Sequence, residues 1–209
     1  MPALSLPESS GVILLPDTAL FPHGHLPLHI FEPRYREMLN DALEGDCLFC
    51  VGSLTGPETD DLAECAAPIG TLALIRASHE LPDGRSELVL QGICRVHFRS
   101  WSAHSSYPHT AIEPFHSVDL PVDEAPYYTS RLRHSISRTL EALPEKIAAA
   151  INGVFDDAGD PFTIADIVAQ QFVTDPGVRR TLLEEPEVAK RIEILIDLLD
   201  RAKRRPQRD

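Results

Sequence analysis

The stretch from residue 13 to residue 45 constrains the fold more than any other, because its hydrophobic pattern changes period once. Side chains 26 to 31 alternate between two sides of an extended segment, and both sides carry apolar residues, which predicts a strand covered on both faces. After Pro33 the apolar residues recur three and four apart, as on one buried stripe of a helix. Proline suits the first helical turn, where its missing N–H has no partner. We therefore expect a strand followed by a helix over 33–43, which Gly45 ends.

Further strand-like segments surround this stretch in the first half of the chain. The Asp83-Gly84 dipeptide between two of them predicts a hairpin, because both turn positions tolerate positive φ. We expect strands at residues 11–15, 47–51, 69–78, 86–91, 94–99 and 110–114. With six or seven strands and a single helix, the composition predicts a closed or nearly closed β-barrel with the 33–43 helix at one end.

Two local patterns refine this expectation. Residues 94–99 alternate without interruption, so Cys94, Val96 and Phe98 are expected to face the core, and the intervening Arg95 is expected to face solvent. Residues 53–68 mix glycine, proline and acidic side chains without any period, which predicts a surface loop.

Past Pro121 the apolar residues take helical spacing. We expect helices over 125–143 and 145–155, a third after Asp160-Pro161 and a last one after Glu185-Pro186. The fold class is therefore α+β, with residues 1–120 forming the barrel and residues 121–209 forming a helical bundle.

The composition and charge of the chain indicate which classes of partner it binds and where in the cell it is found. The chain has 209 residues and is 43% hydrophobic, enough for a sizeable core. A net charge of −13 disfavours nucleic acid and anionic membranes, since both are bound through Lys and Arg. The N-terminus lacks the pattern of an export signal, and no run of 18 apolar residues occurs. We expect a soluble, cytoplasmic protein that binds neither nucleic acid nor a membrane.

The sequence lacks the common motifs of hydrolytic enzymes. No lysine follows a glycine, which excludes a P-loop, and no G-x-S-x-G, H-E-x-x-H or S-x-x-K motif occurs. A hydrolase acting through the histidines of the HGHLPLH segment is the remaining catalytic alternative. We expect no enzyme activity.

Two groups of residues have metal-ligand character. Cys47 and Cys50 have C-x-x-C spacing, but a strand would send them to opposite faces, and no second C-x-x-C occurs. His23, His25 and His29 share one side of an extended segment, but they flank a turn at Gly24. We expect reduced cysteines, no metal and no cofactor.

The opening stretch resembles the start of the Lon N-terminal domain, which also occurs in short stand-alone bacterial proteins. The resemblance rests on an apolar-Phe-Pro turn at 20–22, a Leu-Pro-Leu strand at 26–28 and an Ile-Phe-Glu-Pro-Arg-Tyr helix start at 30–35. It continues in a Gly-Thr-apolar segment at 70–72 and in a Gly-x-x-Arg-apolar-x-apolar segment at 92–98.

The C-terminal half resembles the helical subdomain that precedes the ATPase in Lon. The matching motifs are Ile-Ala-Asp at 164–166, Leu-Leu-Glu at 182–184 and Arg-Ile-Glu at 191–193. The resemblance implies a PUA-like barrel plus a helical bundle, in a stand-alone bacterial member without the ATPase and protease domains. It also implies a non-enzymatic module that binds unfolded or tagged polypeptides and could present them to a protease.

Aromatic anchors give large contact area at low entropic cost, and Phe21, His23 and Trp101 are therefore our candidate substrate contacts. The alternative function is that of a small-molecule or RNA-binding PUA-like module, and the acidic balance argues against RNA.

Overall fold

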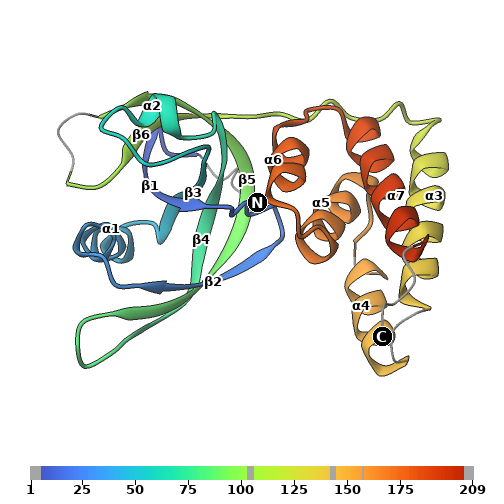
Figure 1. Ribbon diagram of the computed structural model, residues 1–209, viewed down its shortest axis with the longest axis horizontal. Coiled ribbons are helices and arrows are strands. Elements are labelled where there is room, and N and C mark those ends of the chain that lie inside the picture. Colours follow the sequence, from blue (N-terminus) through green and yellow to red (C-terminus); the bar gives the residue numbers. More distant parts are fainter. Residues whose placement is uncertain (1–5, 103–105, 142–144, 157, 205–209) are drawn as a thin grey trace. The chain divides into compact units, whose positions relative to one another are not determined.

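The computed structural model describes residues 6–102, 106–141, 145–156 and 158–204. The chain divides into two compact units, residues 1–116 and 117–209, which are described separately (Figure 1). The fold is mixed, with a six-stranded sheet in the first unit and helices in both.

The strands of the first unit are β1 (Ser9–Pro16), β2 (His25–Ile30), β3 (Leu48–Leu54), β4 (Ile69–Glu80), β5 (Ser86–Trp101) and β6 (His109–Pro114). They are hydrogen-bonded in the order β2-β5-β4-β3-β1-β6, and β6 pairs in addition with β5. The pairing therefore returns to β5, and β2 lies outside the ring of the other five strands.

Strand β5 is long enough to pair with β2 along one part of its length and with β6 along another. Its residues from Ser86 to Gln91 pair with β2, whereas its residues from Val96 to Trp101 pair with β6. The β4–β5 hairpin, predicted from Asp83-Gly84, is confirmed and extends beyond the rest of the sheet (Figure 1). The segments at 86–91 and 94–99, expected as separate strands, are one continuous strand.

Helix α1 (Pro33–Glu44) is confirmed, with proline in its first turn. It buries Tyr35, Met38 and Leu39 against a core cluster that also contains Phe49 and Leu90. At its end the Gly45 N–H donates to the carbonyls of the last turn at 3.1 and 3.2 Å. The hydrophobic stripe in the sequence thus corresponds to the buried face of the helix.

Three local expectations for this unit were wrong. The outer face of β2 is uncovered, with Pro27 and His29 both exposed. Arg95 is 3% exposed and places its guanidinium carbon 5.9 Å from the centre of the Phe21 ring, so the side of β5 expected to face solvent is partly core. The segment at 53–68 contains the end of β3 and the short helix α2 (Leu62–Cys65).

The second unit is helical. Its helices are α3 (Ala125–Leu140), α4 (Glu145–Asp156), α5 (Pro161–Phe172), α6 (Pro176–Glu184) and α7 (Val188–Arg204). Part of the helix expected over 125–143 lies outside the described residues. Helix α6 was missed, although its start has the same signature as the start of α5. In both helices an aspartate precedes a proline, and the aspartate side chain accepts a hydrogen bond from the backbone N–H three residues further on.

A buried ion pair ties the second unit together. Arg191 on α7 donates to the Asp166 carboxylate on α5 at 3.2 Å, and both side chains are only 1% exposed. Arg191 also donates to the Ser117 hydroxyl at 2.9 Å, and its guanidinium lies 5.1 Å from the centre of the Phe162 ring. Asp166 and Arg191 belong to two motifs that carry the resemblance to Lon, so these motifs specify a shared interior contact.

No helix in the described parts of the chain has the length and apolar character needed to cross a membrane.

Candidate functional site

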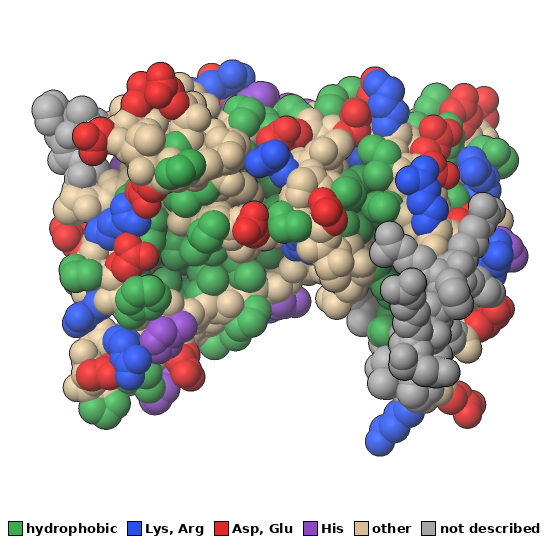
Figure 2. Space-filling model, viewed as in Figure 1, with side chains coloured by type: hydrophobic (Ala, Val, Ile, Leu, Met, Phe, Trp, Pro, Cys, Tyr) green, Lys and Arg blue, Asp and Glu red, His purple; other side chains and the backbone are tan. Residues whose placement is uncertain are grey.

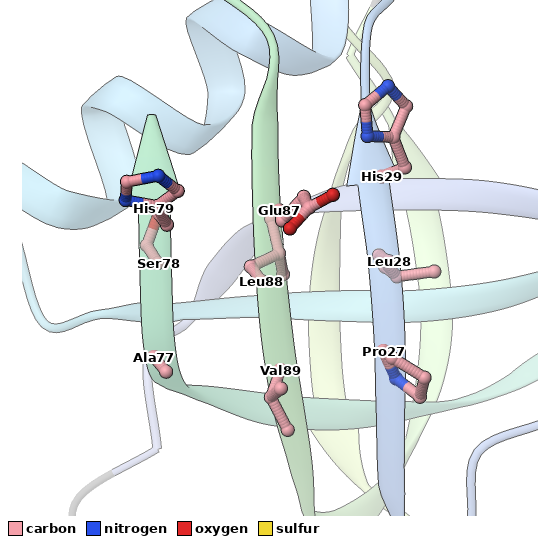
Figure 3. A pocket seen from close by; sticks show the side chains of 9 residues that line it. All are labelled: Pro27, Leu28, His29, Ala77, Ser78, His79, Glu87, Leu88 and Val89. Atoms are coloured by element: carbon pink, nitrogen blue, oxygen red, sulfur yellow. The ribbon is translucent and has the colours of Figure 1, made fainter. Parts of the chain in front are cut away.

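A shallow groove of about 530 Å³ runs across the outer face of β2, β5 and β4 (Figure 3). Strand register aligns its lining residues in rows. Pro27, Val89 and Ala77 are opposite one another and form an apolar row. Side chains that face one another on adjacent strands are in contact range, so this row is a continuous apolar floor.

The next row along the strands is polar. His29 and His79 lie opposite Glu87 from either side, which places one carboxylate between two imidazoles (Figure 3). At the hairpin, Arg85 pairs with Asp83 at 2.7 Å and has a guanidinium nitrogen 3.5 Å from the His29 ring. The groove therefore combines an apolar floor with a polar end near the hairpin.

An exposed aromatic side chain lies at the end of β2. Phe31 is 59% exposed, and its ring stacks on that of His29 with centroids 6.1 Å apart. Exposed aromatic rings of this size are frequent anchors in protein recognition.

The inner side of β2 is also apolar and only partly covered. Leu26 and Leu28 are half-buried, and they pack with Leu15 against the core cluster beneath α1. Figure 2 shows hydrophobic side chains gathered on the face of the first unit. Strand β2 therefore has accessible apolar surface on both of its sides.

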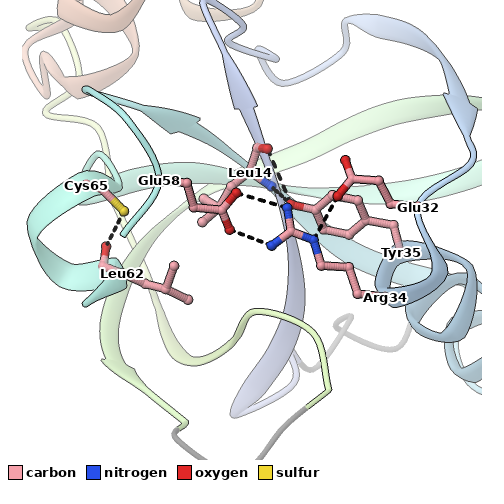
Figure 4. A network of polar contacts seen from close by, with 7 residues as sticks. All are labelled: Leu14, Glu32, Arg34, Tyr35, Glu58, Leu62 and Cys65. Carbon is pink, nitrogen blue, oxygen red and sulfur yellow. Dashed lines mark hydrogen bonds and ion pairs between the residues drawn. The ribbon is translucent and has the colours of Figure 1, made fainter. Parts of the chain in front are cut away.

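A polar network fixes the start of α1 directly after β2 (Figure 4). Arg34 donates to both Glu58 carboxylate oxygens, at 2.5 and 2.9 Å, and to Glu32 at 3.0 Å. The hydrogen bond from Arg34 lowers the pKa of Glu58, and the same bond raises the pKa of Arg34. This clasp joins α1 to the acidic segment between β3 and α2.

Tyr35 secures the same helix from beneath. The Leu14 N–H donates to its hydroxyl at 3.2 Å, and burial raises the pKa of the phenol. The tyrosine is 3% exposed, so this bond joins α1 to β1 inside the core.

The three residues proposed from the sequence lie in different environments. Phe21 is 0% exposed and contributes to a turn in which the Gly24 N–H donates to its carbonyl at 3.0 Å. His23 is exposed in that turn with a φ of 63°, and its N–H donates to the Gly92 carbonyl at 2.9 Å. Trp101 is half-buried against Phe98, with centroids 5.4 Å apart, at the opposite end of β5 from the groove. The structure does not bring these three together.

The groove residues on β4 and β5 were missed. The hairpin signal alone does not find them: counting outward from a two-residue turn at Asp83-Gly84 places Glu80 opposite Glu87. The observed loop is one residue longer, with the Leu81 N–H donating to the Arg85 carbonyl, and this pairs His79 with Glu87. The pairing of β2 with β5 joins segments about sixty residues apart, and nothing in the local sequence indicates it.

Among the described residues, no group of three or more His, Cys, Asp and Glu side chains is arranged to hold a metal ion. His23 lies in the turn before β2, and Cys47 precedes β3 with a φ of 59°. Neither the histidine segment nor the C-x-x-C segment is therefore contained within one strand.

The second unit has a separate apolar hollow of about 560 Å³ among α3, α5, α6 and α7. Leu195, Leu199 and Val168 line it, with Asp175 and Arg201 as its charged members.

Comparison with known proteins gives one consistent result. Residues 11–201 match the family described as the ATP-dependent protease La (LON) substrate-binding domain. The chain is 28% identical to Lon protease of Elusimicrobium minutum, an alignment that covers 93% of this chain and 24% of that protein. It is 26% identical to Lon protease of Azorhizobium caulinodans, over 92% of this chain and 22% of that protein. The chain thus spans about a quarter of the length of these curated relatives.

Solved structures show the same fold. The N-terminal domain of Mycobacterium avium complex Lon protease superposes with a TM-score of 0.73 at 16% identity, covering 92% of this chain and 98% of that one. A Lon N-terminal domain protein from Xanthomonas campestris superposes with a TM-score of 0.61 at 19% identity, over 90% and 97% of the two chains. Because the family match extends across both units, the chain belongs to the LON substrate-binding domain family.

Proposed function

We propose that this chain is a non-enzymatic recognition module that binds extended apolar segments of polypeptide at β2. Membership of a substrate-binding family supports the class of function. One observation carries its location: β2 has accessible apolar surface on both sides, with Pro27, Val89 and Ala77 on the outer face and Leu26 and Leu28 on the inner face.

The remaining parts of the proposal follow from this class. The ring of pairing from β5 through β4, β3, β1 and β6 supports a barrel of the PUA-like type. We further propose a cytoplasmic module whose clients are unfolded or tagged polypeptides and which could present them to a protease. His23 is a candidate contact beside β2, Trp101 is a second one away from the groove, and Phe21 positions the turn that holds His23.

The net charge of −13 favours basic or uncharged clients over acidic ones. Affinity should be modest, because a flexible client loses conformational freedom on binding and the groove is shallow.

The test is binding of fluorescently labelled, unfolded casein to purified protein without ATP. Val89→Lys places a charge on the apolar floor and should weaken binding by about tenfold, in the range of a single interface anchor. Val122→Lys is the matched control: Val122 is 92% exposed in the second unit and lies outside the groove, so its binding should equal that of the parent.

Equal binding by the parent and Val89→Lys would overturn the location. Cleavage of casein by the chain alone, or tight, salt-sensitive binding of RNA without affinity for casein, would overturn the function.

A further inference from the structure

The outer edge of β2 carries backbone groups that face away from the sheet. The Gly92 N–H donates to the Gly24 carbonyl at 2.9 Å, which fixes the hydrogen-bonding phase of the β2–β5 ladder. In an antiparallel pair, residues alternate between those bonded to the partner strand and those whose N–H and C=O point away. Leu26, Leu28 and Ile30 therefore bond to β5, whereas Pro27 and His29 direct their backbone groups outward.

Within the described part of the chain, β2 pairs with β5 alone, and its outward groups at Pro27 and His29 make no backbone hydrogen bond. Side-chain burial agrees with an open edge. Of the six residues of β2 only Ile30 is buried, and Leu26 and Leu28 remain half-exposed although they face inward. Figure 3 shows the strand that bears Pro27, Leu28 and His29 beside the strand that bears Glu87, Leu88 and Val89.

An open edge of this kind can be completed by another strand. We propose that a bound polypeptide segment lies extended against β2 and adds to the sheet as a further strand. This inference rests on the proposed function and specifies its mode: backbone hydrogen bonds supply part of the affinity, and alternate client side chains enter the two apolar surfaces.

Pro27 determines which client backbone groups are used. Its carbonyl can accept a client N–H, but it has no N–H to offer, so the client carbonyl opposite it stays in water. His29 offers both groups. The client must therefore present an N–H toward β2 at every second residue, and it cannot have proline at those positions.

A second copy of this chain fits the edge less well. If two β2 strands paired antiparallel about Pro27, both central donors would be missing, and two chains of net charge −13 would approach one another. A client that is apolar and basic meets neither difficulty, and a basic residue at the hairpin end would lie near Glu87.

The first experiment tests the client backbone. Overlapping ten-residue peptides of β-casein are screened against the full chain, and the tightest binder is resynthesised with a single N-methyl group at each position in turn. We expect N-methylation to weaken binding at alternate positions, by about tenfold where one hydrogen bond is lost and the methyl group also clashes, and to have little effect between them.

The outcomes separate the two proposals. A flat N-methyl profile in a peptide whose apolar side chains still matter in an alanine scan overturns strand addition and leaves the proposed function standing. If no casein peptide binds at all, both proposals fail.

The second experiment tests the protein edge with a matched pair of variants. His29→Pro removes the outward N–H without removing any hydrogen bond between β2 and β5, whereas His29→Ala removes the imidazole and keeps the N–H. We expect about tenfold weaker binding for His29→Pro and a change of less than about threefold for His29→Ala.

Pro27→Val tests the same edge by adding a hydrogen-bond donor instead of removing one. Its result is informative even if His29→Pro does not fold. It adds an outward N–H while keeping the groove apolar, so binding should tighten by about three- to tenfold. Equal affinities for His29→Pro and His29→Ala, or no gain for Pro27→Val, would overturn strand addition.

Discussion

The two halves of β5 carry similar apolar sequence but occupy different surroundings. The half from Val96 to Trp101 pairs with β4 and β6, and β6 in turn pairs with β1, so the ladder continues on both sides. The half from Ser86 to Gln91 pairs with β4 and β2, and the ladder ends at β2. We call these the enclosed half and the open half.

The side chains of the enclosed half are packed tightly against the neighbouring strands. Val96 is 0% exposed, and Phe98 lies against two glycines, Gly52 and Gly70, on β3 and β4. In the open half Leu88 and Leu90 are buried beneath α1, whereas Glu87 and Val89 face the groove. One strand can thus combine a rigid interior with a recognition surface, because recognition requires only one face and one edge to stay uncovered.

The largest expected difference concerns the glycines of the enclosed half. A Cβ atom at Gly70 would lie 2.2 Å from the Phe98 ring and 2.6 Å from the Val51 carbonyl oxygen. Gly70→Ala should therefore reduce the free energy of unfolding by about 3 kcal/mol or more, because neither a ring packed in the core nor the backbone can move away cheaply. Urea unfolding followed by tryptophan fluorescence measures this, since the one tryptophan, Trp101, lies in the first unit.

Gly56→Ala is the control for that substitution. No atom lies within 4 Å of its added Cβ, so the change should stay within about 0.5 kcal/mol. Similar losses for Gly56→Ala and Gly70→Ala would contradict the tight packing of the enclosed half.

A smaller difference in the free energy of unfolding is expected when a valine in each half of β5 is replaced by alanine. Val96→Ala removes two methyl groups from a fully buried position and should cost about 2 kcal/mol. Val89→Ala, at the half-buried position in the groove, should cost less than about 1 kcal/mol but should still weaken binding of casein. Equal losses in the free energy of unfolding for Val96→Ala and Val89→Ala would contradict the difference in packing between the two halves.

The sequence predicted those parts of the fold that depend on local patterns. Helix α1 follows from Pro33 and the apolar spacing after it, and the β4–β5 hairpin follows from Asp83-Gly84. The cap at Asp160 likewise predicts the start of α5, and the same reasoning applied to Asp175 would have found α6. In each case residues close in the chain determine the geometry.

The candidate site depends on contacts that are distant in sequence, and for that reason it was missed. An alternation of apolar residues on both sides of β2 is compatible with two covered faces, and only the position of β2 at the end of the strand order leaves its outer face and its edge open. Arg95 shows the reverse case: a charged residue in an alternating strand is expected outside, but here it lies over the Phe21 ring and is buried.

The smallest expected effect concerns the Arg34–Glu58 ion pair at the start of α1. This contact is electrostatic, whereas the contacts of the enclosed half are apolar. The hydrogen bonds from Arg34 lower the pKa of Glu58 below its ordinary value of 4.5 in the folded state. Because the folded pKa is the lower one, the pair stabilises the fold above pH 4.5, and this contribution is lost as the pH falls through the folded value. The parent and Glu58→Gln should therefore differ by about 0.5–1 kcal/mol at pH 7, since the pair is partly exposed, and the difference should shrink as the pH falls below 4.5. Urea unfolding of both proteins across this range isolates the pair, because the other carboxylates titrate in both. A difference that stays constant with pH would mean that Glu58 contributes through packing and not through its charge.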